Sequence, residues 1–415
     1  MRVLVGLVGG LLILQGIGAI ANHMLGGPFG TLFLVAHLSF LAGYRGYASF
    51  MLAVLGLTLV VAASRAGRPS AAADEAGVPT TGTRARSALA PAVGLFLLAP
   101  LVGEYLLGNV PISEIFALPI LALMYGGGAL LVREVTRRLG RGWPTMFLLA
   151  LAYGVIEPGL LDHSLFNPSF EGLDALNSPS YVPALGLSAA NALSYPVGHA
   201  VWSISVPIAV VETLVPARRT TPWLGTIGLA VTAMAYLLGG ALVFNWARTT
   251  EGFLPSIPQM LGAGIVAAGL IVVAFLVGRS PRPTVDRRAP KPWLVGASAF
   301  VVSSLYSARG ESWWDVGVGV VLVGVAAVVV ARWSRRSGWG AAHRLALAGG
   351  ALLTYAWLGF VLLVLKGTAD TLNLTGQGLL VAGAIVLLSV ARAVVRKEPG
   401  HDESERPDSR RPASR

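Results

Sequence analysis

Residues 143–163 read WPTMFLLALAYGVIEPGLLDH, an apolar stretch that one glutamate, Glu157, interrupts before the run ends at Asp162 and His163. At a rise of about 1.5 Å per residue, a helix of this length crosses the roughly 30 Å hydrocarbon core of a bilayer. Backbone groups in lipid must be hydrogen-bonded within their own segment, which favours a helix over an open sheet. Similar stretches recur along the chain, so the sequence predicts an all-α, polytopic membrane helix bundle.

The composition supports this prediction. Of 415 residues, 54% are apolar and 12% are charged, whereas a soluble domain carries about 25% charged residues. The chain has no cysteine, which excludes disulfides, thiolate metal sites and a cysteine nucleophile. Arginine is far more frequent than lysine. Alanine, glycine and valine are also abundant, and both features are typical of a protein from a GC-rich bacterial genome.

Twelve transmembrane helices are predicted. They cover residues 3–22, 46–64, 88–108, 112–132, 143–163, 190–215, 223–244, 257–278, 293–308, 315–331, 344–365 and 374–391. The short apolar segment 31–43 is interpreted as an interfacial or re-entrant helix. Residues 19–22 resemble a signal-peptidase site, but the apolar run before them is long, so we expect the first span to be retained.

The positive charges indicate how the chain is threaded. When Arg2 is placed in the cytoplasm, cytoplasmic loops and tails contain all of the 31 basic residues except Arg45, Arg248, Arg309 and Lys366. Because basic residues accumulate on the cytoplasmic side, this alternation predicts that both termini are cytoplasmic, in a plasma membrane. The net charge of +11 has the same explanation. No basic run carries interleaved aromatics, so the expected partner is the lipid bilayer and not a nucleic acid.

Composition divides the chain into five parts. They are two leading helices (1–64), a cytoplasmic linker (65–87), functional-core helices (88–217), scaffold helices (218–395) and a disordered cytoplasmic tail (396–415). The spans of the functional core hold Pro91, Pro100, Pro119, Pro158, Pro196 and Pro207, and also Glu104, Glu157, His199 and Glu212. The interiors of the later spans lack both prolines and ionisable groups, which indicates regular packing helices.

A proline inside a helix removes one backbone hydrogen bond and frees the carbonyl four residues earlier. Pro158 is therefore expected to kink its helix and free the carbonyl of Gly154. Pro196 is expected to do the same at Ala192. Broken helices beside ionisable groups are a recurring sign of a binding site in membrane proteins, although proline is also common in membrane helices that have no such role.

Three ionisable side chains, Glu104, Glu157 and His199, are predicted to lie at similar depth in the membrane. A charge that faces lipid there costs at least about 2.5–3.5 kcal/mol, so all three should face the interior of the bundle. Two carboxylates and an imidazole could bind a divalent metal, share a proton or act in catalysis. The alternative is a buried, hydrogen-bonded Glu–His pair. No HExxH spacing is present, so no particular metal or other cofactor is indicated.

Two further features concern the loops. Glu212 is interpreted as an ion-pair partner of Arg218 and Arg219 near the inner face, and Glu134 and Arg138 are spaced as an i,i+4 helix pair. The loop from residue 163 to 183 is interpreted as a lid over the site, or else as an ordinary turn-rich connection.

Glu157 on one helix and Tyr195-Pro-Val-Gly-His199 on the next resemble the two motifs of the CAAX-processing and bacteriocin-processing intramembrane proteases. That family pairs a Glu-Glu-x-x-x-Arg helix with an aromatic-x-x-x-His helix. The resemblance covers about residues 143–215. It implies that Glu157 activates water and that His199 binds a metal ion or the oxyanion.

The chain departs from this pattern at three places. Pro158 stands at the second Glu position and Asp162 at the Arg position. A later histidine within the membrane is missing, because His343 is predicted to be cytoplasmic. The resemblance therefore implies a degenerate, protease-like protein.

Two functions from different classes remain. One is a protease-like intramembrane enzyme, and the other is a transporter or permease that uses the same Glu and His groups for proton or ion coupling. An enzyme predicts a site that opens to the bilayer or to one face, whereas a transporter predicts access from both faces and a structural repeat.

Overall fold

The computed structural model describes residues 83–277 and 283–398, with short stretches inside 10–19, 32–37 and at residue 49. Most of the predicted spans 3–22 and 46–64 therefore lies outside the described residues, as does most of the linker 65–87, the segment 31–43 and the tail 396–415. The chain divides into two units, Met1–Ala92 with Trp223–Leu238, and Val93–Pro222 with Gly239–Arg415.

The first unit includes parts of three labelled helices in its described part. They are α2 (Leu34–His37), the beginning of α4 (Thr83–Pro100) and the first half of α10 (Thr226–Thr250).

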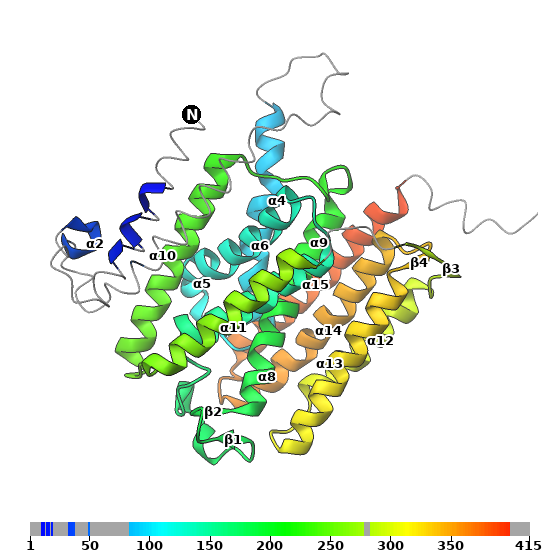
Figure 1. The fold of residues 1–415 in the computed structure, drawn as a ribbon. Helices are drawn as coiled ribbons and strands as arrows, with labels where there is room; N and C mark the ends of the chain where they lie inside the picture. The colour runs from blue at the N-terminus through cyan, green and yellow to red at the C-terminus, as the bar shows by residue number, and fades with distance from the viewer. Residues whose placement is uncertain are drawn as a thin grey trace, which may run out of the picture. The chain divides into compact units, whose positions relative to one another are not determined.

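The second unit contains the remaining helices (Figure 1). Besides the rest of α4 and α10, they are α5 (Leu118–Leu121), α6 (Gly127–Arg138), α7 (Trp143–Ile156), α8 (Ala189–Gly198), α9 (Val206–Leu214), α11 (Ile257–Leu276), α12 (Pro292–Ser307), α13 (Trp313–Trp333), α14 (Ala341–Leu365) and α15 (Thr371–Arg396). Short 3₁₀ turns cover Ile112–Ala117, Phe170–Gly172, Ala175–Asn177 and Pro216–Arg218.

Four π-helical segments interrupt the helices of the predicted functional core. They cover Leu101–Leu106, Ala122–Gly126, Glu157–Leu161 and His199–Ser205. Each contains a proline or follows one within three residues, because Pro100, Pro119, Pro158 and Pro196 stand there. A π segment makes i→i+5 hydrogen bonds and widens the helix. Where kinks were expected from the prolines, the structure therefore has wider, π-helical turns. The backbone stays helical there: Gly198, just before the fourth segment, has right-handed helical angles (φ −55°, ψ −55°).

Nine helices in the described part of the chain are long and apolar enough to cross a membrane, and Pro292–Ser307 is a shorter apolar helix. These ten helices correspond to the predicted spans from 88–108 to 374–391. The protein is thus a mostly helical, multi-pass membrane protein, and the count of twelve spans with both ends in the cytoplasm stays a prediction.

Short strands lie at two opposite ends of the second unit (Figure 1). β1 (Tyr181–Val182) pairs antiparallel with β2 (Leu187–Ser188), and Tyr181 lies opposite Ser188. β3 (Val285–Arg288) pairs in parallel with β4 (Arg336–Ser337) at the other end. The all-α prediction did not include these strands.

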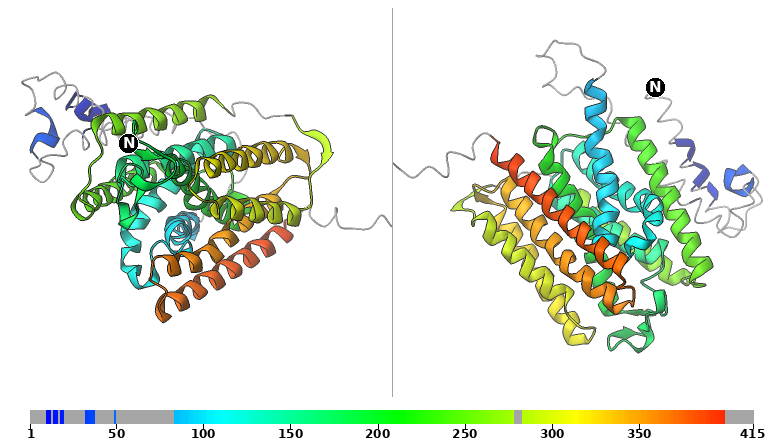
Figure 2. Two further views of the ribbon diagram at one scale, coloured as in Figure 1. Left: turned by 90° about the horizontal axis from the view of Figure 1, so that it is seen from below. Right: turned by 180° about the vertical axis from the view of Figure 1, so that it is seen from behind.

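α14 is the central packing helix of the second unit. It packs against α12 and α15, which Figure 2 shows beside it, and against α9. The indole of Trp202 stacks on the ring of Tyr355 at a centroid distance of 4.5 Å and donates to the carbonyl of Ala351 at 2.7 Å. A helix of the predicted scaffold therefore buries the π segment that carries His199.

A buried ion-pair network closes what we call the arginine end, defined by Arg133, Glu134, Arg137 and Glu212. Arg133 is fully buried and contacts Glu134 at 2.6 Å and Glu212 at 3.0 Å. Arg137 Nη2 contacts Glu212 at 2.6 Å. The i,i+4 pair Glu134–Arg138 is present at 3.8 Å, although Glu134 is fully buried and not on a helix surface.

The structure gives Glu212 two partners other than the predicted Arg218 and Arg219. Arg133 and Arg137 hold this carboxylate, because α6 and α9 pack together and bring distant residues to it. Arg133 also donates to the backbone carbonyls of Arg218 and Arg219, while the Arg219 guanidinium pairs with Glu398.

Candidate functional site

Glu157 and His199 form a direct pair inside the second unit. The Nε2 atom of His199 lies 2.8 Å from Oε2 of Glu157. Glu157 is 2% exposed and the His199 side chain is 15% exposed. Both residues begin a π segment, and α7 packs against α8 and against the segment that begins at His199. The two side chains meet without an intervening water, as their predicted depth and inward direction led us to expect.

A chain of polar side chains extends from this pair in both directions. The hydroxyl of Tyr125 donates to Oε1 of Glu157 at 3.2 Å, and Tyr125 lies near the Glu104 side chain. On the other side, Nδ1 of His199 lies 3.2 Å from Oγ of Ser203. The order is therefore Glu104, Tyr125, Glu157, His199 and Ser203, and we call these five residues the acid–base chain.

All five members of the acid–base chain lie in π segments. Glu104 belongs to Leu101–Leu106 and Tyr125 to Ala122–Gly126. Glu157 begins the third segment, and His199 and Ser203 belong to the fourth. π segments inside α-helices are frequent at functional sites, where they redirect side chains.

Two tyrosine rings enclose the imidazole. The centroid of His199 lies 5.7 Å from that of Tyr125 and 6.1 Å from that of Tyr153. Tyr153 fits because position 128 is glycine: a Cβ atom there would lie 2.4 Å from the ring of Tyr153. Gly128, the last residue of the Gly126-Gly127-Gly128 run, therefore leaves space for the Tyr153 ring beside His199.

A second set of contacts leads from Glu104 to the end of the unit opposite the arginine end. Asn109 Nδ2 donates to Oε2 of Glu104 at 2.8 Å. Lys366 donates to Oδ1 of Asn109 at 2.8 Å and contacts Oε2 of Glu171 at 2.9 Å. We call the end defined by Asn109, Glu171 and Lys366 the loop end. Glu171 belongs to the segment interpreted as a lid, so this loop contacts Lys366, while its role as a lid stays a prediction.

The structure does not bring Glu104, Glu157 and His199 together as ligands of one metal ion. Tyr125 donates to Glu157, while Glu104 accepts from Asn109. In the described ranges, no group of three or more His, Asp or Glu side chains is arranged to hold a metal ion. The metal site at these residues stays a prediction.

The residues that depart from the protease motifs have local structural roles. Asp162 Oδ1 accepts a hydrogen bond from the backbone N–H of Ser164 at 2.9 Å and so shapes the start of the loop. Pro158 lies inside the π segment Glu157–Leu161. His343 lies outside the site, because its Nε2 contacts the carbonyl of Pro290 at 2.8 Å.

Sequence reasoning missed Tyr125, Asn109 and Lys366. A tyrosine next to a Gly-Gly-Gly run resembles ordinary packing, and Asn109 resembles a turn residue. Lys366 carried the clearest sign, because it breaks the alternation of basic residues along the chain.

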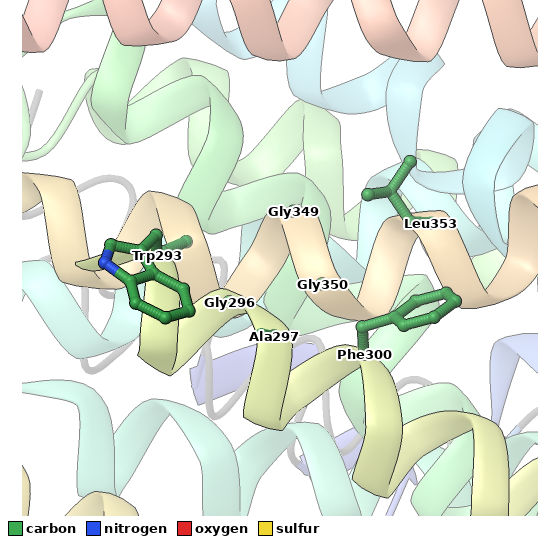
Figure 3. Close-up of a pocket in the computed structure, with 8 residues that line it drawn as sticks. Trp293, Gly296, Ala297, Phe300, Gly349, Gly350 and Leu353 are labelled. Atoms are coloured by element: carbon green, nitrogen blue, oxygen red, sulfur yellow. The ribbon is translucent and has the colours of Figure 1, made fainter. Parts of the chain in front are cut away.

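An apolar groove of about 350 Å³ lies between α12 and α14 (Figure 3). Its lining residues are Trp293, Gly296, Ala297, Phe300, Ala346, Gly349, Gly350 and Leu353. A Cβ atom at position 350 would lie 2.3 Å from the carbonyl oxygen of Gly296, so small residues let the two helices approach closely, as is common between membrane helices. The lining contains no ionisable group and offers no acid–base chemistry.

Comparisons with known proteins agree with this architecture. No curated protein and no solved structure matches the chain. A family model matches residues 93–397 and thus covers the acid–base chain and both ends of the second unit. The resemblance to the CAAX-processing proteases stays a prediction beside this finding. The chain belongs to the family described as "Uncharacterized membrane protein family".

Proposed function

We propose that this protein is a membrane-embedded hydrolase, resembling the intramembrane proteases, in which Glu157 and His199 form the catalytic acid–base pair. The observation that supports the proposal most is the 2.8 Å contact between these two buried side chains. A buried carboxylate that faces an imidazole is an arrangement for proton transfer.

The geometry supports a specific division of roles. Glu157 accepts a proton from water, and the hydroxide that forms attacks the carbonyl carbon of a scissile amide. Glu157 passes this proton to His199, which delivers it to the leaving amine as the carbonyl–nitrogen bond breaks. Tyr125 donates to Oε1 of Glu157 and so keeps Oε2 directed toward the imidazole. No metal ion is needed for these steps.

The polar surroundings of the site favour an enzyme over a transporter. Polar contacts run from Glu104 to the loop end through Asn109 and Lys366. Toward the arginine end, α9 buries Val206, Ile208 and Val210 before it reaches Glu212. A site whose polar contacts lead toward one end suits hydrolysis of a membrane-anchored peptide, whereas transport requires access from both faces.

The test uses the purified protein in proteoliposomes together with the membrane proteins of a bacterial host. New peptide N-termini are identified by mass spectrometry after incubation with the wild-type protein, with Glu157→Gln and with Glu114→Gln. Glu114 is exposed and lies outside the acid–base chain, so this variant is the matched control. The proposal expects new termini with wild type and Glu114→Gln and none with Glu157→Gln. Identical sets of termini from all three proteins would contradict it.

A second candidate function is proton-coupled transport. The observation that favours it is the row of proton-exchanging groups Tyr125, Glu157 and His199, with Glu104 nearby. Proteoliposomes that contain a pH-sensitive dye separate the two candidates. A proton flux that Glu157→Gln abolishes, without any Glu157-dependent cleavage, would replace the hydrolase proposal by the transporter.

A further inference from the structure

Building on the function proposed above, we propose that Lys366 is a positioning residue for the acid–base chain. It fixes the side-chain amide of Asn109, which in turn holds the carboxylate of Glu104. Together with Glu171 it also closes the loop end of the site. Lys366 contacts no reacting group and acts through these neighbours.

The ammonium group of Lys366 finds three acceptors. Its Nζ atom lies 3.0 Å from the backbone oxygen of Asn109, 2.8 Å from Asn109 Oδ1 and 2.9 Å from Glu171 Oε2. An ammonium has three N–H donors and no acceptor, so these contacts use its full capacity. Two of the three acceptors belong to Asn109, which is the residue whose orientation the lysine controls.

The amide of Asn109 is thereby held in one orientation. An amide offers one oxygen that accepts and one nitrogen that donates. Because Lys366 attracts Oδ1, the nitrogen Nδ2 must face the other way, and there it donates to Oε2 of Glu104 at 2.8 Å. Rotation of the amide would place its oxygen against the carboxylate and its N–H groups against the cation. By holding Oδ1 of Asn109, Lys366 therefore ensures that the amide N–H group, and not the amide oxygen, faces the Glu104 carboxylate.

The backbone on both sides of this contact is fixed by close packing. Gly108 has φ +75°, and a Cβ atom there would lie 2.5 Å from the carbonyl oxygen of Gly359. Gly359 belongs to α14, and this helix ends immediately before Lys366. Gln377 of α15 also donates to the carbonyl of Leu106 at 2.9 Å. The turn that carries Asn109 and the helix end that carries Lys366 are thus held against each other.

Glu171 links the loop to this contact from the other side. It has φ +49°, a left-handed conformation that is uncommon for residues other than glycine. Its backbone N–H donates to Oε2 of Glu251 at 3.2 Å while its carboxylate faces Lys366. Strained backbone of this kind persists where the surroundings impose it and is frequent at functional sites. The loop is therefore tied to the helix ends at the position where it meets Lys366.

The first experiment measures closure, and it uses the absence of cysteine from the chain. Ser203 is buried beside His199, so Ser203→Cys is a near-isosteric reporter at the inner end of the acid–base chain. The reaction rate of this thiol with a charged methanethiosulfonate reagent is followed in the full-length, detergent-purified protein. We expect Lys366→Met and Glu171→Gln each to raise the rate about tenfold, because one exposed ion pair or one to two hydrogen bonds are lost.

Lys291→Met is the matched control, since Lys291 lies at the opposite end, next to the start of α12. Lys291→Met should leave the labelling rate unchanged. Lys366→Arg should label as slowly as the background with Lys366, because arginine keeps the positive charge and the N–H donors. Equal labelling rates for Lys366→Met, Lys291→Met and the unmodified background would overturn closure by Lys366.

The second experiment separates positioning from closure. Asn109→Asp keeps both acceptors for Lys366 but replaces the donor that faces Glu104 by a second carboxylate oxygen. Labelling should therefore stay slow, whereas the infrared carboxyl bands that disappear in Glu104→Gln should shift. Lys366→Met should shift the same bands, and Lys291→Met should not. Bands that do not shift in either Asn109→Asp or Lys366→Met would overturn the positioning role.

Neither readout depends on catalysis, so the two proposals can fail separately. If Glu157→Gln proves silent in the cleavage assay while labelling and infrared bands respond as expected, the hydrolase proposal fails and the role of Lys366 stands. If cleavage depends on Glu157 but neither readout responds to Lys366→Met, the role of Lys366 fails alone.

Discussion

His199 Nε2 lies 2.8 Å from Glu157 Oε2, and each of these residues is the first of a π-helical segment. Pro158 lies inside the first segment and Pro196 three residues before the second, which explains why the helices widen there. A proline cannot donate the i→i−4 hydrogen bond, so the ladder is interrupted beside it. The local backbone defect and the meeting of the two side chains therefore have a common origin in the sequence.

The first prediction concerns the packing that holds the pair together. A Cβ atom at position 154 would lie 2.5 Å from the carbonyl oxygen of Pro196, which is backbone and cannot rotate away. Gly154→Ala should therefore push α7 and α8 apart and lower the stability by about 1–3 kcal/mol. Thermal unfolding in detergent, followed by tryptophan fluorescence, measures the effect.

Gly264→Ala is the matched control for this substitution. Gly264 also lies in a helix, α11, and a Cβ atom there meets nothing within 4 Å. This variant should unfold at or above the wild-type temperature, since alanine favours the helix by about 1 kcal/mol. Equal melting temperatures for the two variants would show that α7 and α8 do not approach as closely as described.

The second prediction concerns the arginine end. The Glu212 carboxylate forms ion pairs with Arg133 at 3.0 Å and with Arg137 at 2.6 Å, and all three side chains are buried. Removing one partner of a buried ion pair leaves a charge without compensation and costs about 3–5 kcal/mol. Glu212→Ala should therefore lower the melting temperature and the amount of folded protein in the membrane, measured by fluorescence-detected gel filtration.

The exposed Glu114 supplies the comparison for the arginine end as well. Glu114→Ala should change stability by no more than about 0.5 kcal/mol, as surface substitutions usually do. If Glu212→Ala is as stable as Glu114→Ala, then Glu212 is not the residue that holds the two arginines.

The third prediction concerns topology. The alternation of basic residues predicts that positions 75 and 285 are both cytoplasmic. Reporter fusions at these positions should read inside, and a fusion at position 177 should read outside. The contact between Arg335 Nε and the carbonyl of Pro283 places the loops before β3 and β4 at the same end of the second unit. An outside reading at 75 or 285 would break the twelve-span threading.

The sequence was sufficient to predict the spans from residue 88 onward and the pairing of Glu157 with His199. Long apolar runs determine the helices because lipid leaves the backbone few alternatives. A charged side chain within the membrane must point into the helix bundle, away from lipid. Two such residues at similar depth on neighbouring helices were therefore expected to meet. Both predictions rest on a large free-energy cost that depends little on the neighbouring helices.

Other features depend on partners that are distant in the sequence. Glu212 lies near Arg218 along the chain, but the packing of α6 against α9 brings Arg133 and Arg137 to it instead. The widening of a helix beside a proline likewise depends on what packs against it, so a kink and a π segment cannot be distinguished from sequence. Tyr125 was missed because only the fold shows that its hydroxyl lies between two carboxylates.

Two basic residues that break the charge alternation have specific contacts in the structure. Lys366 contacts Asn109 and Glu171, and Arg309 donates to Ser194 and lies over the ring of Tyr306 at 3.8 Å. Basic residues on the side that the topology rule disfavours are thus engaged by specific partners in the described part of the chain. Such exceptions identify positions worth examining in other membrane sequences.

The fourth prediction, on whether Glu157 and His199 work as one acid–base pair, is tested most directly by a double-mutant cycle on the cleavage rate in proteoliposomes. Residues that act as a unit are not additive, and general acid–base catalysis contributes about 10²–10⁴-fold. Glu157→Gln, His199→Gln and the double variant should therefore all lose activity to the same extent, by at least about 100-fold. Losses that multiply in the double variant, or full activity in either single variant, would contradict the account.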